Sequence, residues 1–407
     1  MVLVADAVGG VWDASLTLAE GLLAGDAAAV LLVVVGPAPS APKLAAARGV
    51  PGLSLQVIDG SLEFMAGGHN WLETFRGEVA RLAAEWQADV VHVNASGAFG
   101  LASVGREAPI RRLARRPVVV LGVHGDVVTW WRWVKDGGNE PSTFPDYLHW
   151  QRDLAWRALR QADAIVCPSA FMAGEVAHVY GLERRPAVIH NAVTPLPLPA
   201  PPVERERGLA ALVGRAWDEA KNVPLVTQAL GSCRRSWRVV VAGDLVEPGG
   251  QAATVARSPG MTYLGFLDKP ALSRLFHRAA VYLAASSHEP FGLSAAEAAL
   301  CGCAVVANDL PAYREVWGDA AMFFRRNDPR ALAATLDRLA GDPAEVARLA
   351  EAGRRRVAER YTVGRMAGAH VGLYRAAMAA RDAHKTDAAV KTRRDGSPAL
   401  TTETRGI

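Results

Sequence analysis

The sequence predicts an α/β protein made of two doubly wound domains with mainly parallel sheets. Strand-like runs of β-branched residues alternate with helical stretches along most of the chain, and a proline-rich segment divides this alternation into two halves. The length of 407 residues fits two domains of roughly 150–200 residues each. Half of the residues are hydrophobic, which is sufficient for two separate cores.

The first half of the chain contains short β-branched runs separated by stretches of helical periodicity. Leu18 and Leu22, for example, are spaced as they would be in a helix packed on a sheet. Strand and helix alternating in this way predict a parallel sheet covered on both faces. The predicted strands are 2–4, 29–35, 53–58, 90–93, 118–123 and 164–166, and the predicted helices include 15–23, 71–86 and 153–161.

A proline-rich run at residues 194–202 interrupts the alternation, because proline lacks the amide donor that a helix requires. We expect a semi-rigid linker at 194–203, with one domain at 1–193 and a second at 204–362. A last helix is expected at about 363–381, and the polar tail 382–407 is expected to be disordered. In the second half the predicted strands are 209–213, 238–242, 261–263, 281–284, 304–307 and 322–324, and the predicted helices are 222–230, 270–279, 292–301 and 329–339.

Charge and cysteine content exclude several classes of protein. The chain has 45 basic and 41 acidic residues, a mild excess that does not indicate nucleic-acid binding. Cys301 and Cys303 are close in sequence, but without a second Cys/His pair they make a poor metal site, so free thiols are expected. The longest apolar run, 27–35, is too short to span a membrane. We expect a cytoplasmic protein.

The segment 287–299 has the features of a phosphate and sugar site. It follows a buried strand and begins a helix near Gly292, where unpaired backbone N–H groups can bind an anion. Glu289 precedes the helix and Glu297 lies about two turns into it, and a carboxylate can accept hydrogen bonds from a ribose or sugar diol. The alternative is that Glu289 caps the helix and Glu297 lies on a solvated face. The combination of both carboxylates with Gly292 favours the functional interpretation.

A second motif, at residues 213–222, places polar residues at the carboxyl end of a predicted strand. Ligands collect at these strand ends in open α/β sheets. Arg215 and Lys221, which follow Gly214, could neutralise a diphosphate and stabilise it as it leaves. The alternative is a pair of solvated surface cations.

These motifs resemble glycosyltransferase family 4, the retaining enzymes of group 1 with the GT-B fold of two Rossmann-like domains facing a central cleft. The resemblance extends from residue 1 to about 375. It implies that Arg215 and Lys221 hold the donor diphosphate, that Glu297 binds the nucleotide ribose, and that the last helix crosses back onto the first domain. It also implies that Glu289 and the backbone of Phe291, Gly292 and Leu293 contact the transferred sugar and the phosphate. The matching pieces are Gly9–Trp12, His124–Asp126, Cys167–Ser169, His190–Val193, Gly214–Arg215, Lys221–Asn222, Ala242–Asp244 and the pair Glu289/Glu297.

The first domain carries the candidate acceptor side. Gly9 and Gly10 follow the first strand, where glycine allows the backbone to approach a phosphate closely. By resemblance His124 lies beside the reacting sugar carbon, and the alternative is a histidine satisfied by backbone at a strand end. The tryptophans of 129–133 are interpreted as an acceptor wall, with core packing as the alternative. For the basic cluster 111–116, a solvated helix face is favoured over contact with a membrane.

The predicted function is metal-independent sugar transfer from a nucleotide-diphosphate-sugar donor to a hydroxyl of a glycan, lipid or small-molecule acceptor, with no further cofactor. No D-x-D motif occurs and no His, Asp or Glu cluster has metal-ligand spacing, so Arg215, Lys221 and helix termini are expected to balance the diphosphate. Two alternatives remain at this point, a nucleotide-sugar epimerase of the same shape and an inactive sugar-nucleotide-binding protein. The donor, the acceptor and the oligomeric state are not specified by the sequence.

Overall fold

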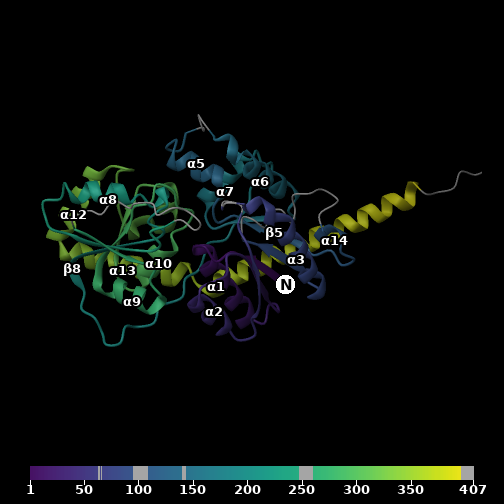
Figure 1. Ribbon diagram of the computed structural model, residues 1–407, viewed down its shortest axis with the longest axis horizontal. Coiled ribbons are helices and arrows are strands. Elements are labelled where there is room, and N and C mark those ends of the chain that lie inside the picture. Colours follow the sequence, from purple (N-terminus) through teal and green to yellow (C-terminus); the bar gives the residue numbers. More distant parts are fainter. Residues whose placement is uncertain (63–64, 66, 95–108, 140–143, 247–259, 396–407) are drawn as a thin grey trace, which may run out of the picture.

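The computed structural model describes residues 1–62, 65, 67–94, 109–139, 144–246 and 260–395. The chain forms two α/β lobes, each built around one parallel sheet (Figure 1). The predicted fold class, with two doubly wound Rossmann-like domains, is therefore confirmed.

The first lobe holds a seven-stranded sheet in the order β3-β2-β1-β4-β5-β6-β7, in which every neighbouring pair is parallel. Its strands are β1 (Val2–Ala5), β2 (Leu31–Gly36), β3 (Ser54–Asp59), β4 (Val90–Val93), β5 (Val118–Gly122), β6 (Ala164–Cys167) and β7 (Ala187–Val188). Its helices include α1 (Gly10–Ala24), α2 (Ala41–Arg48), α3 (Leu72–Glu85), α5 (Val127–Val134), α6 (His149–Gln161) and α7 (Ala170–Val179), with 3-10 turns at Gly68–Trp71, Pro109–Arg112 and Asp146–Leu148.

The second lobe holds a six-stranded parallel sheet in the order β10-β9-β8-β11-β12-β13. Its strands are β8 (Glu206–Val213), β9 (Arg238–Ala242), β10 (Met261–Gly265), β11 (Ala279–Ala284), β12 (Ala304–Asn308) and β13 (Met322–Phe324). Its helices include α8 (Val223–Leu230), α9 (Lys269–Arg278), α10 (Leu293–Leu300), α11 (Pro311–Trp317), α12 (Pro329–Gly341) and α13 (Pro343–Arg360), with 3-10 turns η5 (Glu219–Lys221) and Gly318–Ala320.

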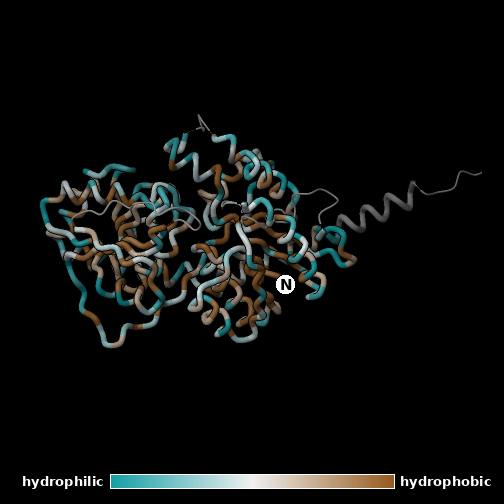
Figure 2. The backbone as a smooth tube through the Cα atoms, in the orientation of Figure 1, coloured by the Kyte–Doolittle hydropathy of each residue, from teal (hydrophilic) through white to brown (hydrophobic). Residues whose placement is uncertain are grey.

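Each sheet is buried on both faces, which explains why its central strands are apolar throughout rather than alternating. Successive side chains of a strand point to opposite faces. In β1, Val2 and Val4 accordingly join one core while Leu3 and Ala5 join the core on the other face. Figure 2 shows the hydrophobic segments concentrated in the interior of both lobes. The strand order reverses at β1 and at β8, and loops at such switch points form ligand sites in this kind of sheet.

Helix α14 (Val363–Asp395) ties the end of the chain to the first lobe, where it packs against α1 and β5 (Figure 1). The two helices approach closely at Gly21, where an added Cβ would lie 2.7 Å from Cγ1 of Val363. The helix continues beyond the expected end at 381, so the predicted disorder is wrong for residues 382–395. This stretch is rich in Ala, Lys and Arg and has neither Pro nor Gly, so its helix propensity is high. Residues 396–407 of the predicted tail lie outside the described residues.

The linker at 194–203 has no helix or strand. Two side chains of α9, in the second lobe, form hydrogen bonds with its backbone. The Ser273 hydroxyl donates to the Pro197 carbonyl at 2.5 Å, and the Arg274 guanidinium donates to the Ala200 carbonyl at 3.0 Å. These bonds fix the path of an extended segment that cannot form a backbone ladder of its own.

Glu315 of α11, in the second lobe, forms hydrogen bonds with the first lobe at the start of α7. Its carboxylate accepts hydrogen bonds from the amides of Ala170 and Phe171 at 2.7 and 3.0 Å, at the start of α7. It also contacts Nε2 of His190 at 2.9 Å. Burial would raise the pKa of Glu315, but the His190 and amide hydrogen bonds lower it. One second-lobe carboxylate thus caps a first-lobe helix.

We expect Glu315→Ala to lower the free energy of unfolding by about 1–3 kcal/mol, because two amides and a histidine would lose their acceptor. Denaturant unfolding measures this loss. The exposed residue Glu351, which pairs with Arg354 on α13, offers a control, since Glu351→Ala should change the stability by less than about 0.5 kcal/mol. Equal stability of the two variants would contradict the capping role.

Candidate functional site

A cavity of about 1030 Å³ lies between the two lobes and receives the switch-point loops of both sheets. The eleven residues that the sequence predicts to act in catalysis or to bind the donor all line this cavity. Those of the first lobe are Gly9, Gly10 and His124, and those of the second are Gly214, Arg215, Lys221, Glu289, Phe291, Gly292, Leu293 and Glu297.

The loop after β8 is brought to the cavity by a close approach of two backbones. An added Cβ on Gly243 would lie only 2.0 Å from the Gly214 carbonyl oxygen, and Gly243 has φ 133°. A side chain at Gly243 would therefore collide with the neighbouring turn. An added Cβ on Gly214 would lie 3.0 Å from the Lys221 side chain, so Lys221 folds back over this glycine.

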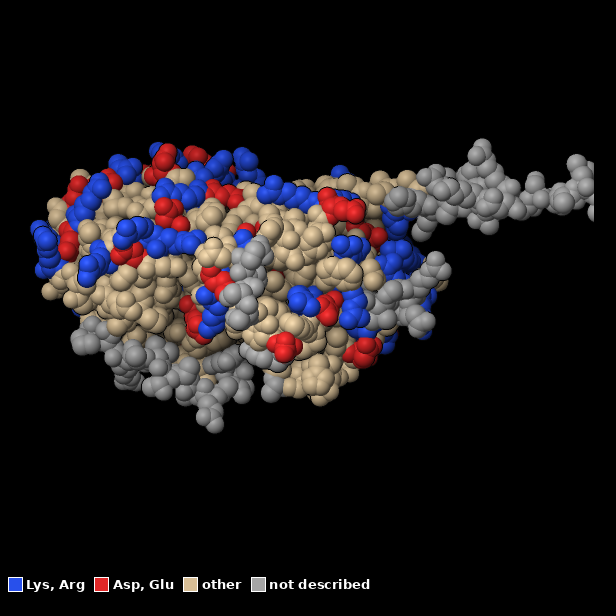
Figure 3. Space-filling view, turned by 90° about the horizontal axis from the view of Figure 1, so that it is seen from above, with Lys and Arg blue, Asp and Glu red and all other residues tan. Residues whose placement is uncertain are grey.

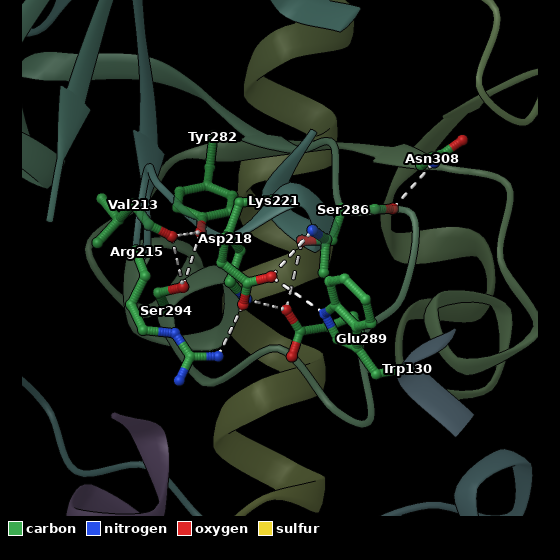
Figure 4. A network of polar contacts seen from close by, with 11 residues as sticks. Trp130, Val213, Arg215, Asp218, Lys221, Tyr282, Ser286, Glu289, Ser294 and Asn308 are labelled. Carbon is green, nitrogen blue, oxygen red and sulfur yellow. Dashed lines mark hydrogen bonds and ion pairs between the residues drawn. The ribbon is translucent and has the colours of Figure 1, made fainter. Parts of the chain in front are cut away.

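Lys221 and Glu289 form the central ion pair of the second lobe (Figure 4). The Lys221 ammonium lies 2.8 Å from Oε2 of Glu289, and their side chains are 19% and 15% exposed. The Ser286 hydroxyl donates to the same carboxylate oxygen at 3.4 Å. Glu289 thus balances the lysine charge and holds its ammonium group at the cavity wall.

Arg215 points toward the first lobe. Its guanidinium donates to Oδ2 of Asp218 at 2.7 Å and lies over the Trp217 ring, 5.2 Å from the ring centroid. An added Cβ on Gly9 would lie 3.4 Å from the guanidinium, so the glycine turn of the first lobe comes close to this cation. Arg215 and Lys221 together supply two positive charges to one region of the cavity.

The start of α10 supplies the backbone groups that the sequence predicted. Gly292 precedes the helix with φ 93° and ψ 58°, a left-handed conformation that favours glycine. The first N–H groups of a helix have no partner within it. Phe291 is 2% exposed and packs against Tyr361, so its side chain belongs to the core. Gly10 meets this segment from the other lobe, because an added Cβ there would lie 3.3 Å from Leu293.

Glu297 is paired with a lysine that also contacts the first lobe. The Lys269 ammonium lies 2.6 Å from Oε1 of Glu297 and 3.0 Å from Oδ1 of Asp13 on α1. Burial raises the pKa of Glu297, and the Lys269 charge opposes this rise. The alternative that Glu297 lies on a solvated helix face is thereby excluded, since its side chain is only 12% exposed.

His124 lies just beyond the end of β5, with two further histidines behind it. Burial lowers the pKa of His124 to about 4, as it does for His370 of α14. The rings of His370 and His92 lie 5.4 Å apart, and the Tyr374 hydroxyl is 2.7 Å from Nδ1 of His92. Burial also lowers the pKa of His92. His124 is therefore a neutral imidazole near pH 7, able to donate or accept a hydrogen bond.

These histidines should make the protein sensitive to acid. Their folded pKa values lie below the unfolded value of 6.5, so the stability they contribute is complete above pH 6.5 and is lost as the pH falls toward 4. Each should contribute a slope of about 1.4 kcal/mol per pH unit in this window. In His370→Gln, the free energy of unfolding measured in urea should change less steeply with pH, by about 1.4 kcal/mol per pH unit between pH 6.5 and 4. An unchanged slope would contradict the assignment of His370 to the acid sensitivity.

Of the three tryptophans predicted to form an acceptor wall, one faces the cavity between the lobes. Trp130 lines the cavity. Trp133 is 8% exposed, belongs to a core cluster and donates to Glu175 at 2.7 Å, while Trp131 packs edge-on against Phe144. The segment is a helix, α5, so consecutive indoles point in different directions. Trp150 of α6 also lines the cavity, although the sequence did not indicate it.

The basic cluster 111–116 is largely paired within its own lobe. Arg115 and Arg116 form ion pairs with Asp89 and Asp163, and Arg111 donates to the Gln161 carbonyl at 2.8 Å. On the face shown in Figure 3, basic and acidic side chains are interspersed. Within the described part of the chain, no helix is long and apolar enough to cross a membrane, and no group of His, Cys, Asp and Glu could hold a metal ion.

Several charged residues that line the cavity were not predicted as site residues, namely Asp6, Asp13, Lys43, Asp218, Asp268 and Lys269. Asp218 and Lys269 pair with predicted residues, and Asp13 reaches Lys269 across the cleft. Lys43 of α2 donates to the Ala7 carbonyl beside the glycine turn, and burial lowers its pKa. The sequence shows no helical periodicity at 41–48, so it contained no signal for Lys43.

Comparison with known proteins agrees with this arrangement. The family model described as Glycosyltransferase Family 4 matches residues 8–195, and the model described as Glycosyl transferases group 1 matches residues 208–342. Glycogen synthase of Mycobacterium tuberculosis is 29% identical over 230 residues, 54% of this chain and 55% of that protein. The match thus spans about half the length of this relative. The 2-deoxystreptamine glucosyltransferase of Streptomyces kanamyceticus is 27% identical over 328 residues, 75% of this chain and 81% of that protein.

Solved structures share the two-lobed fold at low sequence identity. Anabaena HepE in complex with UDP and glucose has a TM-score of 0.68 at 16% identity, covering 92% of this chain and 100% of that chain. Sucrose-phosphate synthase from Thermosynechococcus elongatus has a TM-score of 0.69 at 18% identity, covering 93% and 100%. Because the two family models fall on the two lobes and the fold agrees, the chain belongs to the group 1, family 4 glycosyltransferases with the GT-B fold.

Proposed function

We propose that the protein transfers a sugar from a nucleoside-diphosphate sugar to an acceptor hydroxyl, with retention of the anomeric configuration and without a metal ion. The observation that supports this most is the placement of Arg215 and Lys221 on one wall of a cavity whose other wall carries His124. Two cations beside the start of α10 fit the charge and the oxygen atoms of a diphosphate.

In this proposal the nucleotide binds to the second lobe and the acceptor to the first. The bond between the sugar carbon and the phosphate oxygen breaks, and Arg215 and Lys221 stabilise the negative charge of the departing diphosphate. The acceptor hydroxyl attacks from the same face, and its proton passes to a phosphate oxygen. His124, being neutral, orients a hydroxyl of the sugar or the acceptor by a hydrogen bond. Closed lobes exclude water, which limits hydrolysis of the donor.

UDP-glucose is the first donor to test. HepE, which shares the fold, has been solved with UDP-glucose, and one relative is a glucosyltransferase. Because a bound donor stabilises the folded state, a thermal-shift screen of UDP-, GDP-, ADP- and TDP-sugars identifies the nucleotide. Incubation of the selected donor with a panel of glycans, lipids and aminocyclitols, followed by mass spectrometry and NMR of the product, then tests transfer and retention.

The proposal predicts a glycoside with the donor's anomeric configuration, formed equally well in EDTA. An inverted product would overturn retention, and loss of activity in EDTA would overturn metal independence. Conversion of the donor sugar without any acceptor would instead identify an epimerase. Donor binding with neither transfer nor hydrolysis would identify an inactive sugar-nucleotide-binding protein.

A further inference from the structure

Asp218 lies at the centre of the contacts around Arg215. Its side chain is only 5% exposed, and both of its oxygens have partners. Oδ2 accepts a hydrogen bond from the Arg215 guanidinium at 2.7 Å, and Oδ1 accepts one from the Ala220 amide at 3.0 Å. A further hydrogen bond to Oδ1 comes from the other lobe, because the indole N–H of Trp130 donates to it at 3.1 Å (Figure 4).

The position of Trp130 is determined inside the first lobe. Asp126 caps α5 by accepting hydrogen bonds from the amides of Val128 and Thr129 at 3.1 and 2.9 Å, and the Tyr180 hydroxyl donates to its other oxygen. This capping residue comes two positions after His124 in the sequence. The helix that carries Trp130 therefore begins at the segment that brings His124 to the cavity, and its start is fixed by buried hydrogen bonds.

A second contact joins α5 to the same loop of the second lobe, but it is of a different kind. The Lys135 ammonium lies 2.6 Å from Glu219, with side chains 34% and 61% exposed. An ion pair this accessible to water contributes little. The Trp130–Asp218 hydrogen bond is less accessible, since the Asp218 side chain is only 5% exposed, and it acts directly on the partner of Arg215.

Arg215 depends on such a partner for a defined orientation. Its side chain is 38% exposed and ends in the open cavity. Catalysis by charge stabilisation requires that the cation already points to where charge develops. One nitrogen of the guanidinium is held by Asp218, which leaves its remaining N–H groups for a ligand.

We propose that Trp130 and Asp218 are positioning residues for sugar transfer. The indole N–H of the acceptor lobe orients the Asp218 carboxylate, which orients Arg215 toward the diphosphate. This inference rests on the proposed function. It adds that closure of the two lobes is coupled to the orientation of Arg215, so the diphosphate site is complete only while the lobes are closed on each other. An open molecule, with Trp130 withdrawn, then holds the donor without activating it, which protects the donor from water.

A double-mutant cycle of Trp130→Phe and Asp218→Ala tests this coupling. Trp130→Phe removes the N–H donor and keeps an aromatic ring, and it should lower kcat about tenfold and weaken UDP binding about threefold. The KM for the acceptor should stay the same, because the ring remains in the cavity wall. In the Asp218→Ala background, Trp130→Phe should have no further effect on kcat.

Two matched variants separate this coupling from simpler explanations. Trp156→Phe changes an exposed tryptophan of α6 that does not line the cavity, and it should leave kcat unchanged. Lys135→Ala removes the exposed ion pair with Glu219 just after α5, and it should lower kcat less than twofold, or about 0.4 kcal/mol. Additive effects of the two substitutions in the cycle, a raised acceptor KM in Trp130→Phe, or an equal loss of kcat in Lys135→Ala would each overturn the proposal.

Failure of this inference and failure of the proposed function give different results. Transfer by the wild-type protein together with full kcat in Trp130→Phe refutes the coupling alone. Absence of transfer with every donor refutes the function, and the coupling is then judged by calorimetry with UDP, GDP and ADP. Weaker nucleotide binding in Trp130→Phe, and no further weakening in the double variant, would support it. Equal nucleotide binding in Trp130→Phe and the wild type, or no binding by any variant, would overturn it.

Discussion

Replacing Lys221 with methionine should lower the rate of sugar transfer by about 10²–10³-fold, the usual effect of removing one group that stabilises developing negative charge. Methionine retains most of the length of the side chain, and the ammonium is lost. The ammonium lies at the cavity wall, as does Arg215, and its charge is balanced by Glu289 at 2.8 Å. Steady-state kinetics with saturating donor and acceptor measure the change in kcat.

The same substitution leaves the Glu289 carboxylate largely buried without its cation, so a loss of stability has to be separated from a loss of catalysis. The double variant Lys221→Met/Glu289→Gln removes the uncompensated charge and should recover stability, measured as Tm, without recovering kcat. Arg354→Ala is the control for loss of an exposed cation, since Arg354 is half-exposed and is not among the residues that line the cavity. Near-normal turnover in Lys221→Met would refute the assignment of the diphosphate site.

Much of this architecture was predictable because parallel sheets impose a simple rule on the sequence. Their strands are buried on both faces and read as apolar runs, and the loops at their carboxyl ends meet at one edge. Gly9, Gly214 and Glu289 each follow such a run, and the structure brings all three to one cavity. Their spacing along the chain, together with the family resemblance, therefore indicates a site from the sequence alone.

The contacts that hold the site together were less predictable, because they join residues far apart in sequence. Trp130 and Asp218 are 88 positions apart, and the meeting of Asp13 with Lys269 depends on how the two lobes close. No local pattern encodes such pairs. The short helix α2 has only Ala47 buried, so it carries almost no apolar periodicity. Near the C-terminus, α14 extends to Asp395, beyond the end that the sequence predicted. The prediction stopped too early because polar residues that favour a helix have the same composition as a disordered tail.

Glu297→Ala should weaken the binding of the matching nucleoside diphosphate by about 10–100-fold, the effect of losing hydrogen bonds to a charged acceptor. The carboxylate lines the cavity two turns into α10, with the side chain 12% exposed and one oxygen on Lys269. Among the described residues, the other oxygen of Glu297 has no partner as close as the Lys269 ammonium. We expect this second oxygen to accept a hydrogen bond from a ribose hydroxyl. Calorimetric titration with the nucleotide chosen by the thermal-shift screen measures the loss.

Inorganic pyrophosphate provides the comparison that assigns this loss to the ribose. It should inhibit or bind the wild-type protein and Glu297→Ala equally, because Arg215 and Lys221 are unchanged, whereas Lys221→Met should lose both ligands. Lys269 retains Asp13 as a partner in the variant, so the lobes should remain joined on this side. A parallel loss of nucleotide and pyrophosphate affinity would mean that Glu297 maintains the shape of the whole site. A selective loss of the nucleotide would place the ribose at the carboxylate, with the diphosphate and the sugar extending from it toward His124.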